Sequence, residues 1–151
     1  MKTKLLYHGS IKKIKGKYFL PKKQDDLEKK PKNMYSGVYS TSIKDIAIAM
    51  AIISCKGVYS ASLNFKKRPY GKIYDGWPKQ KYIYLYYFNP DNFKKSGGSG
   101  KQFVSLKKVK PIRVKRLEVK DHIFLVKKAN NFEVKRFLQK HKLKLWEKKL
   151  K

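Results

Sequence analysis

Apolar and polar residues alternate along most of the chain, and this pattern predicts a sheet of short strands. The clearest strand covers residues 81–88, where aromatic and aliphatic side chains fall on both faces, as in a central strand. Residues 122–126 fit either a short strand or a loop. Further strands are predicted by alternation at 4–8, 38–41, 58–63, 102–106 and 112–119.

Two stretches have helical spacing instead. In residues 46–53, apolar side chains recur on one face. Ser42 is the expected N-cap of this helix, with Asp45 three residues later as a weak capping box. In the second stretch, Asn131 is expected to cap a helix that ends near residue 141. The side chains expected to face inward there are Phe132, Phe137 and Leu138.

Many strands and two helices predict an α+β fold whose sheet is mostly antiparallel or mixed. At 151 residues, the chain is expected to form a single basic domain, 1–151, with residues 142–151 as a basic C-terminal tail. This tail is either a basic amphipathic segment for a polyanion or a frayed end docked by Trp146.

Several connections separate these elements. Residues 11–20 alternate lysine with apolar residues and are expected to form a loop with a short edge strand. Residues 22–33 carry a mixed run of charges, which predicts an exposed connection or, alternatively, a lid over a binding site. Residues 65–77 and 96–100 are rich in turn-forming residues and are expected to be loops.

The composition combines a formal net charge of +29 with 14% aromatic residues, including eleven tyrosines. Basic disordered tails have few aromatic residues, so this combination predicts a folded basic protein. A polyanion is the expected partner, with nucleic acid (DNA or RNA) favoured over an anionic membrane surface. In the alternative, the chain is simply rich in lysine and the charge has no specific partner.

A candidate nucleic-acid-binding surface lies where aromatic and basic residues are interleaved. Such a surface can hold phosphates and stack on bases. In the alternative, the aromatic side chains only pack beneath solvated lysines. The residues of this candidate surface are Lys66, Lys67, Arg68, Tyr70, Tyr74 and Trp77.

Cys55 is the only cysteine, which excludes an intrachain disulfide and a cysteine zinc cluster. Residues 1–10 lack the apolar region of a signal peptide, and the longest apolar run, 46–53, is too short to span a bilayer. A soluble, cytoplasmic protein is therefore expected.

Most hydrolytic mechanisms are poorly supported by the sequence. Zinc, calcium and P-loop spacings are missing, and a serine-nucleophile elbow is missing too. No acidic residue lies between Asp45 and Asp75, or between Asp91 and Glu118. A two-carboxylate hydrolase or a two-metal nuclease would need such residues in pairs.

Two of the expected strands end in residues that suit a ligand site. The first ends in His8, Gly9 and Ser10, which supply an imidazole, a backbone that a ligand can approach closely and a hydroxyl. The second precedes the alanine-rich helix and begins with a glycine at position 37. It ends in Tyr39, Ser40 and Thr41.

These motifs resemble the His–Tyr–Glu branch of the ADP-ribosyltransferase superfamily. There, one strand ends in His-Gly-Ser or His-Gly-Thr, a second carries Gly-x-Tyr before small residues and a helix, and a third carries a glutamate. The third motif is best matched by residues 102–105, which begin with Gln102. The resemblance frames nearly the whole chain and implies a transferase that uses NAD as co-substrate.

The resemblance also implies a role for each residue. His8 would bond the adenosine ribose of NAD, and the backbone of Gly9 would hold the nicotinamide amide. Tyr39 would stack on the nicotinamide ring and, with His8 and Gln102, form the catalytic set. The same cleft would be lined by Ser10, Ser40 and Thr41.

Gln102 departs from the family pattern, because a glutamate is expected there. Its amide can accept a hydrogen bond from a ribose hydroxyl, but it carries no charge to offset the oxocarbenium character of the breaking bond. Either the chain is impaired, or Asp75, Glu118 or Asp121 takes this part. Two functions follow: an NAD-dependent transferase that acts on nucleic acid, or a catalytically impaired nucleic-acid-binding module on the same fold.

Overall fold

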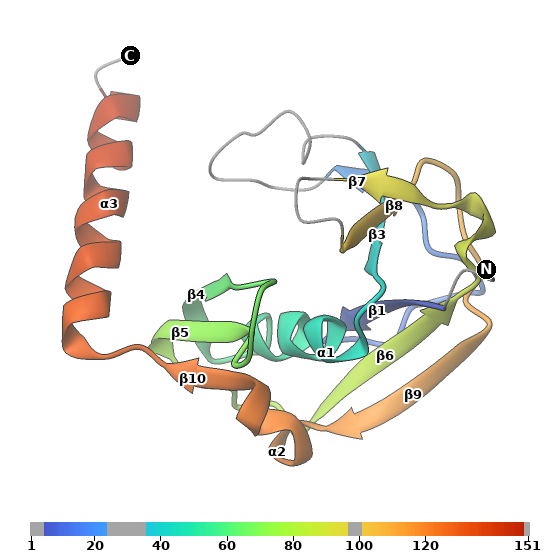
Figure 1. The fold of residues 1–151 in the computed structure, drawn as a ribbon, viewed down its shortest axis with the longest axis horizontal. Helices are drawn as coiled ribbons and strands as arrows, with labels where there is room; N and C mark the ends of the chain where they lie inside the picture. Colours follow the sequence, from blue (N-terminus) through green and yellow to red (C-terminus); the bar gives the residue numbers. More distant parts are fainter. Residues whose placement is uncertain (1–4, 24–35, 97–100, 150–151) are drawn as a thin grey trace.

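The computed structural model describes residues 5–23, 36–96 and 101–149 and has an α+β fold, as the sequence predicted (Figure 1). The larger sheet contains β1 (Leu6–Ser10), β2 (Lys22–Lys23), β3 (Ser36–Thr41), β6 (Tyr82–Phe88), β7 (Lys94–Ser96), β8 (Gln102–Ser105) and β9 (Arg113–Glu118). The smaller sheet contains β4 (Val58–Leu63), β5 (Gly71–Gly76) and β10 (Val126–Lys128). The helices are α1 (Lys44–Ile53), α2 (Val119–His122) and α3 (Asn131–Lys149), with short 3-10 turns η2 (Pro90–Asn92) and η3 (Ile123–Leu125).

Most strand pairs are antiparallel, again as predicted. The strand order in the larger sheet is β7-β8-β3-β1-β6-β9, with β2 paired to β3. In the smaller sheet the order is β10-β5-β4, and only the pairing of β10 with β5 is parallel among the described strands.

Helix α1 lies between the two sheets and contacts β1 and β6 on one side and β4 and β5 on the other (Figure 1). Residues 46–53 of this helix are apolar on every side, which is typical of a buried helix. Cys55, just beyond the helix, is buried in the same core, and this burial raises the pKa of its thiol to about 11. The buried residues of α1 are Ile46, Ala47, Ile48, Ala49, Ala51 and Ile52.

Strand β1 approaches α1 most closely at Gly9. A Cβ atom at this position would overlap the carbonyl oxygen of Ala47 and crowd the side chain of Ala51. Only glycine allows the strand and the helix to come this close. Gly9 therefore has a packing role, whatever it contributes to a ligand.

The opposite face of the larger sheet is covered by residues 11–20. In this segment, Phe19 exchanges two backbone hydrogen bonds with Val109, with N···O distances of 2.8 and 3.0 Å. The Phe19 ring packs edge-on against Tyr86 and Phe88, with centroids 4.6 and 5.3 Å apart. The expected short edge strand is therefore one isolated bridge, and apolar contacts hold the rest of the segment.

The start of α1 differs from the sequence prediction. The N-cap residue is Ile43, not Ser42, and no side chain caps the helix. The hydroxyl of Thr41 accepts a hydrogen bond from the backbone N–H of Ile43 at 3.2 Å and so fixes the turn before it. Asp45 forms an ion pair with Arg68 and takes no part in a capping box.

Residues 65–77 contain strand β5, where the sequence predicted only a loop. Glycines at both ends of the strand obscure its pattern, yet Ile73 is fully buried and the strand pairs with both β4 and β10. Pairing and burial outweigh local propensity here. The predicted lid at 22–33 falls outside the described residues apart from β2, and residues 97–100 fall outside them too.

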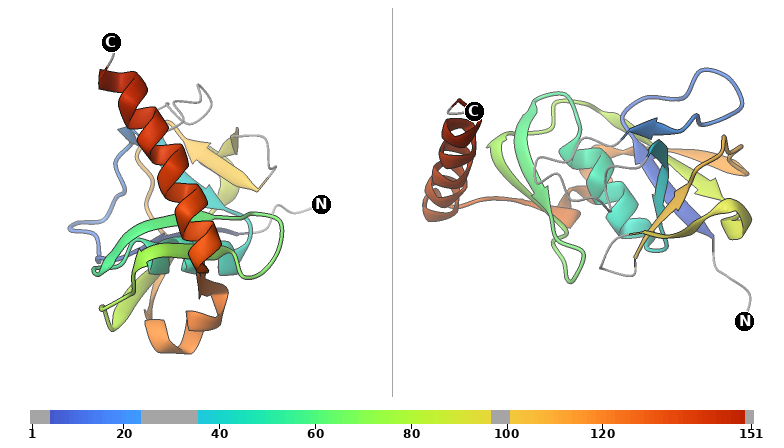
Figure 2. Two further views of the ribbon diagram at one scale, coloured as in Figure 1. Left: turned by 90° about the vertical axis from the view of Figure 1, so that its left-hand side faces the viewer. Right: turned by 90° about the horizontal axis from the view of Figure 1, so that it is seen from above.

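Helix α3 extends away from the smaller sheet (Figure 2). It begins with a reciprocal capping box: the Asn130 side chain accepts from the N–H of Glu133 at 2.8 Å, and the Glu133 carboxylate accepts from the N–H of Asn130 at 3.1 Å. The cap is thus Asn130, one residue before the predicted Asn131. The helix also continues to Lys149, past the predicted end.

Only part of the predicted inner face of α3 is covered. Phe137 stacks on Tyr74 of β5, with centroids 4.0 Å apart and planes at 7°. Phe132 is 71% exposed and Leu138 is 50% exposed, so their predicted inward orientation is wrong. Within the described parts of the chain, no helix has both the length and the apolar character needed to cross a membrane.

The first prediction concerns the ion pair between Glu133 and Lys72, which fastens α3 to β5. The hydrogen bonds from Lys72 and from Asn130 N–H hold the pKa of the Glu133 carboxyl below its ordinary value. The stabilisation is therefore present at neutral pH and is lost as the pH falls through the ordinary glutamate pKa of about 4.3 and then the lowered one. At pH 7, we expect Glu133→Gln to speed hydrogen exchange of the amides at 131–140.

Glutamine can still close the capping box, so the substitution removes the ion pair and keeps the cap. As the pH falls through the lowered pKa of Glu133, the exchange of Glu133→Gln and wild type should converge, because both side chains are then uncharged. Asp121→Asn, at an exposed position of α2, is the matched control and should not change α3 at either pH. A difference for Glu133→Gln that persists at low pH would contradict the role of the ion pair.

The second prediction concerns Gly9. Gly9→Ala should lower the free energy of unfolding by about 3 kcal/mol, because α1 must move away from β1 to admit the methyl group. Urea unfolding measures this loss. Ser10→Ala is the control from the same strand: among the described residues its hydroxyl bonds only the nearby Lys12 backbone, so we expect a loss below about 1 kcal/mol. Equal losses for the two variants would rule out the close approach.

Candidate functional site

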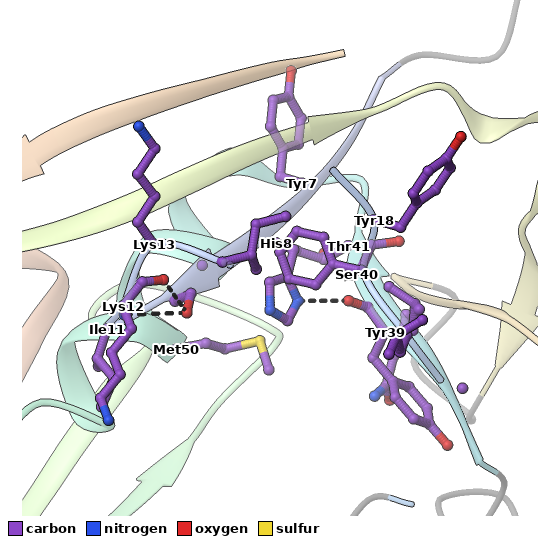
Figure 3. A pocket seen from close by; sticks show the side chains of 18 of the residues that line it. Tyr7, His8, Ile11, Lys12, Lys13, Tyr18, Tyr39, Ser40, Thr41 and Met50 are labelled. Carbon is purple, nitrogen blue, oxygen red and sulfur yellow. Dashed lines mark hydrogen bonds between the residues drawn. The ribbon is translucent and has the colours of Figure 1, made fainter. Parts of the chain in front are cut away.

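Strand β1 parts from β3 within the larger sheet. Along its other edge, β1 pairs with β6 from Leu6 to Ser10, but its register with β3 contains the single pair Tyr7 and Thr41. Beyond that pair, Nδ1 of His8 lies 2.7 Å from the carbonyl oxygen of Tyr39 (Figure 3). A carbonyl oxygen only accepts, so Nδ1–H is the donor and the imidazole takes the place of a ladder hydrogen bond.

A cleft of about 750 Å³ opens at this divergence. Its walls are the end of β1, the strand β3 and the segment 11–20, with Met50 of α1, Phe65 and Gln102 of β8 completing the lining (Figure 3). This volume is in the range of pockets that hold a ligand of drug or cofactor size.

All three sequence motifs meet in this cleft. The strands that carry them are adjacent, in the order β8-β3-β1, and Gln102 lies opposite Thr41 in the register of β8 with β3. The structure thus brings together residues more than ninety positions apart in the chain, from His8 to Gln102. The motif residues that line the cleft are His8, Gly9, Ser10, Tyr39, Ser40, Thr41 and Gln102.

One whole wall of the cleft, the segment 11–20, was not predicted from the sequence. Its Phe19 ring packs edge-on against the imidazole of His8, with centroids 5.1 Å apart. Tyr18 is 44% exposed, and the ammonium of Lys108 lies 4.7 Å from its ring centroid. The apolar run Tyr-Phe-Leu before Pro21, within a lysine-rich loop, is the sequence signal that this segment packs against an apolar surface.

The rim of the cleft is cationic. Lys12, Lys13 and Lys15 line it, and none of the described lining residues is a carboxylate. The alternatives considered for the missing glutamate lie elsewhere: Asp75 is on β5, Glu118 ends β9 beside Lys120, and Asp121 is on α2. None of these three carboxylates is among the residues that line the cleft.

Ser40 carries an unsatisfied polar group at the wall of the cleft. Its side chain is 6% exposed, and its hydroxyl has no hydrogen-bond partner among the described residues. A buried hydroxyl without a partner costs free energy, and such groups often mark a place where a ligand or water binds. Burial also raises the pKa of the neighbouring Tyr39, so its ring remains a neutral phenol.

The candidate nucleic-acid residues do not form a single stacking surface. Tyr70 packs against the main core, and Tyr74 is covered by Phe137 of α3. Tyr70 comes directly before β5, whereas Trp77, which is 40% exposed, comes directly after it, at the opposite end of the strand. The basic residues Lys66, Lys67 and Arg68 are exposed together in the connection between β4 and β5.

No protein-family model, no curated protein and no solved structure matches this chain. Within the described residues there is also no cluster of histidine, cysteine and acidic side chains that could hold a metal ion.

The third prediction concerns the unsatisfied hydroxyl. Ser40→Ala should raise the free energy of unfolding by about 1 kcal/mol, because it removes a buried polar group that has no partner. Ser105→Ala is the matched control, since the equally buried Ser105 hydroxyl donates to the Lys107 carbonyl at 3.0 Å. That variant should lose about 1 kcal/mol. Similar losses at both serines would show that Ser40 has a partner in the folded protein.

Proposed function

We propose that this chain is an ADP-ribosyltransferase-like protein that binds NAD in the cleft between β1 and β3 and transfers ADP-ribose to nucleic acid. The supporting observation is the meeting of three short motifs, from three adjacent strands, around one cleft. His8 and Tyr39 are in direct contact there, and Gln102 lines the same space.

The residues of the cleft fit a dinucleotide. Aromatic side chains supply flat surfaces for the nicotinamide and adenine rings, and the rim lysines supply positive charge for the pyrophosphate. The bond to the Tyr39 carbonyl and the edge contact with Phe19 fix the imidazole of His8, which would bond a ribose hydroxyl. The Ser40 hydroxyl would gain the partner that it lacks.

The transfer breaks the bond between nicotinamide and ribose. Nicotinamide leaves with the bonding electron pair, C1 of the ribose becomes cationic, and a lone pair of the acceptor forms the new bond while the acceptor loses a proton. The protein must orient the leaving ring and stabilise the cation. Tyr39 would do the first by stacking, and the Gln102 carbonyl would accept a hydrogen bond from a ribose hydroxyl.

Gln102 limits this chemistry. A neutral amide replaces the carboxylate that would offset the cationic ribose, and loss of one such electrostatic group costs about 3–4 kcal/mol, or a factor of about 10² to 10³ in rate. The rim lysines add positive charge nearby. We therefore propose tight capture of NAD combined with slow transfer.

A second candidate function is a nucleic-acid-binding module that has lost catalysis. It is favoured by one observation: no carboxylate lines the described part of the cleft, in a chain of net charge +29. In this case the cationic cleft would hold phosphates and nucleotide bases without cleaving NAD.

The fourth prediction separates these candidates. Gln102→Glu should raise the rate of nicotinamide release from NAD by about 10², because the new carboxylate stabilises the cationic ribose. Nicotinamide release is measured by chromatography, and NAD binding by calorimetry. Tyr39→Ala should abolish NAD binding and, in the double variant, the gain in rate. Gln139→Glu, at an exposed position of α3, is the matched control and should change neither quantity.

Three results would contradict the transferase. Failure of every variant to bind NAD would leave only the nucleic-acid-binding module. Binding without a gain in Gln102→Glu would mean that the Gln102 side chain does not reach the ribose. Rapid wild-type turnover that Gln102→Ala leaves unchanged would assign the chemistry to another residue.

A further inference from the structure

A row of side chains runs across the larger sheet from the cleft to its edge. Ser10 pairs with Tyr84 in the register of β1 with β6, and Tyr84 pairs with Arg116 in the register of β6 with β9. Paired residues point to the same face of a sheet. Arg116 therefore lies on the face that carries His8 and Ser10, about 10 Å from Ser10 across two strand spacings.

The rim of the cleft is tied to this row. The side-chain amide of Gln80 donates to the carbonyl of Ile11 at 2.6 Å and to the carbonyl of Tyr82 at 2.8 Å. The hydroxyl of Tyr86 accepts from the N–H of Ile14 at 2.7 Å. The segment with the rim lysines is thus fastened directly to β6, the strand that carries Tyr82 and Tyr84.

Cations and aromatic rings alternate along this surface. The guanidinium of Arg116 lies 4.3 Å from the centroid of the Tyr82 ring, and the ammonium of Lys81 lies 5.3 Å from it. Glu118 is an acidic residue on the same face, opposite Tyr82 in the register of β6 with β9, and its carboxylate lies 3.4 Å from the ammonium of Lys120. We call this surface the basic strip, and its residues are Lys12, Lys13, Lys15, Tyr82, Tyr84 and Arg116.

We propose that the basic strip binds single-stranded nucleic acid and leads it to the cleft. Arg116 and the rim lysines contact successive phosphates, and the partly exposed rings of Tyr82 and Tyr84 lie against bases. A strand without a partner fits this surface better than a duplex does. Its bases are free to stack, and one of them can enter a cleft that a paired base does not reach.

This inference deepens the nucleic-acid part of the proposed function, but it needs no NAD. It also assigns binding to the sheet face instead of to the basic connection between β4 and β5. In that connection, Arg68 is already engaged by Asp45, and two of the nearby tyrosines are packed.

The fifth prediction compares charge reversals on three surfaces. Binding of a fluorescent deoxythymidine oligonucleotide of about twelve nucleotides is measured by anisotropy at about 50 mM salt, without NAD. Arg116→Glu should weaken binding about tenfold. The same change in charge at exposed sites elsewhere, Lys67→Glu before β5 and Lys140→Glu on α3, should weaken it less than about threefold. Arg116→Ala should also lower the salt slope by about 1.

Several outcomes would contradict the proposal that the basic strip binds single-stranded nucleic acid. Equal weakening by all three reversals would mean that binding follows net charge alone, and the largest loss in Lys67→Glu would move the site to the β4–β5 connection. Tighter binding of a duplex of equal length would exclude a single-stranded ligand. Binding to anionic vesicles but not to the oligonucleotide would assign the strip to a membrane surface. NAD calorimetry on Arg116→Glu keeps the two proposals separate, because that variant should bind NAD as wild type does.

Discussion

The position of β1 is the constraint on which the cleft depends. The strand is held on one face by α1, at the glycine that permits their close approach, and along the whole of one edge by β6. It therefore cannot follow β3 as well, and the two strands separate after one pair. The His8 imidazole closes the gap with a hydrogen bond to the neighbouring strand. The contacts that fix β1 in the fold are therefore also the contacts that open the cleft.

Much of the fold could be predicted because burial shows in local patterns. Strand β6 was predicted from its unbroken run of aromatic and aliphatic residues. The structure divides these residues between two cores, with Leu85 and Tyr87 toward α1 and Tyr86 and Phe88 away from it. The strands that carry the three motifs were also predicted near their observed bounds.

What sequence patterns missed depends on contacts between distant residues. Strand β5 exists because β4 and β10 flank it, and the segment 11–20 is a wall of the cleft because Phe19 meets Val109 and the rings of β6. The N-cap of α1 was misassigned because Asp45 finds a partner in Arg68, more than twenty residues away. The absence of a carboxylate from the described cleft lining likewise required coordinates, since acidic residues nearby in sequence say little about which side chains converge.

The burial of Cys55 has a consequence for the chemistry of the whole chain. A thiol reacts as its thiolate, and burial in the core around α1 keeps this one protonated far above neutral pH. Since no other cysteine is present, the folded protein behaves toward oxidants and alkylating reagents as if it had no thiol at all. Modification of this buried thiol requires the core around it to open. The rate at which a thiol reagent labels the protein therefore measures how often its core opens.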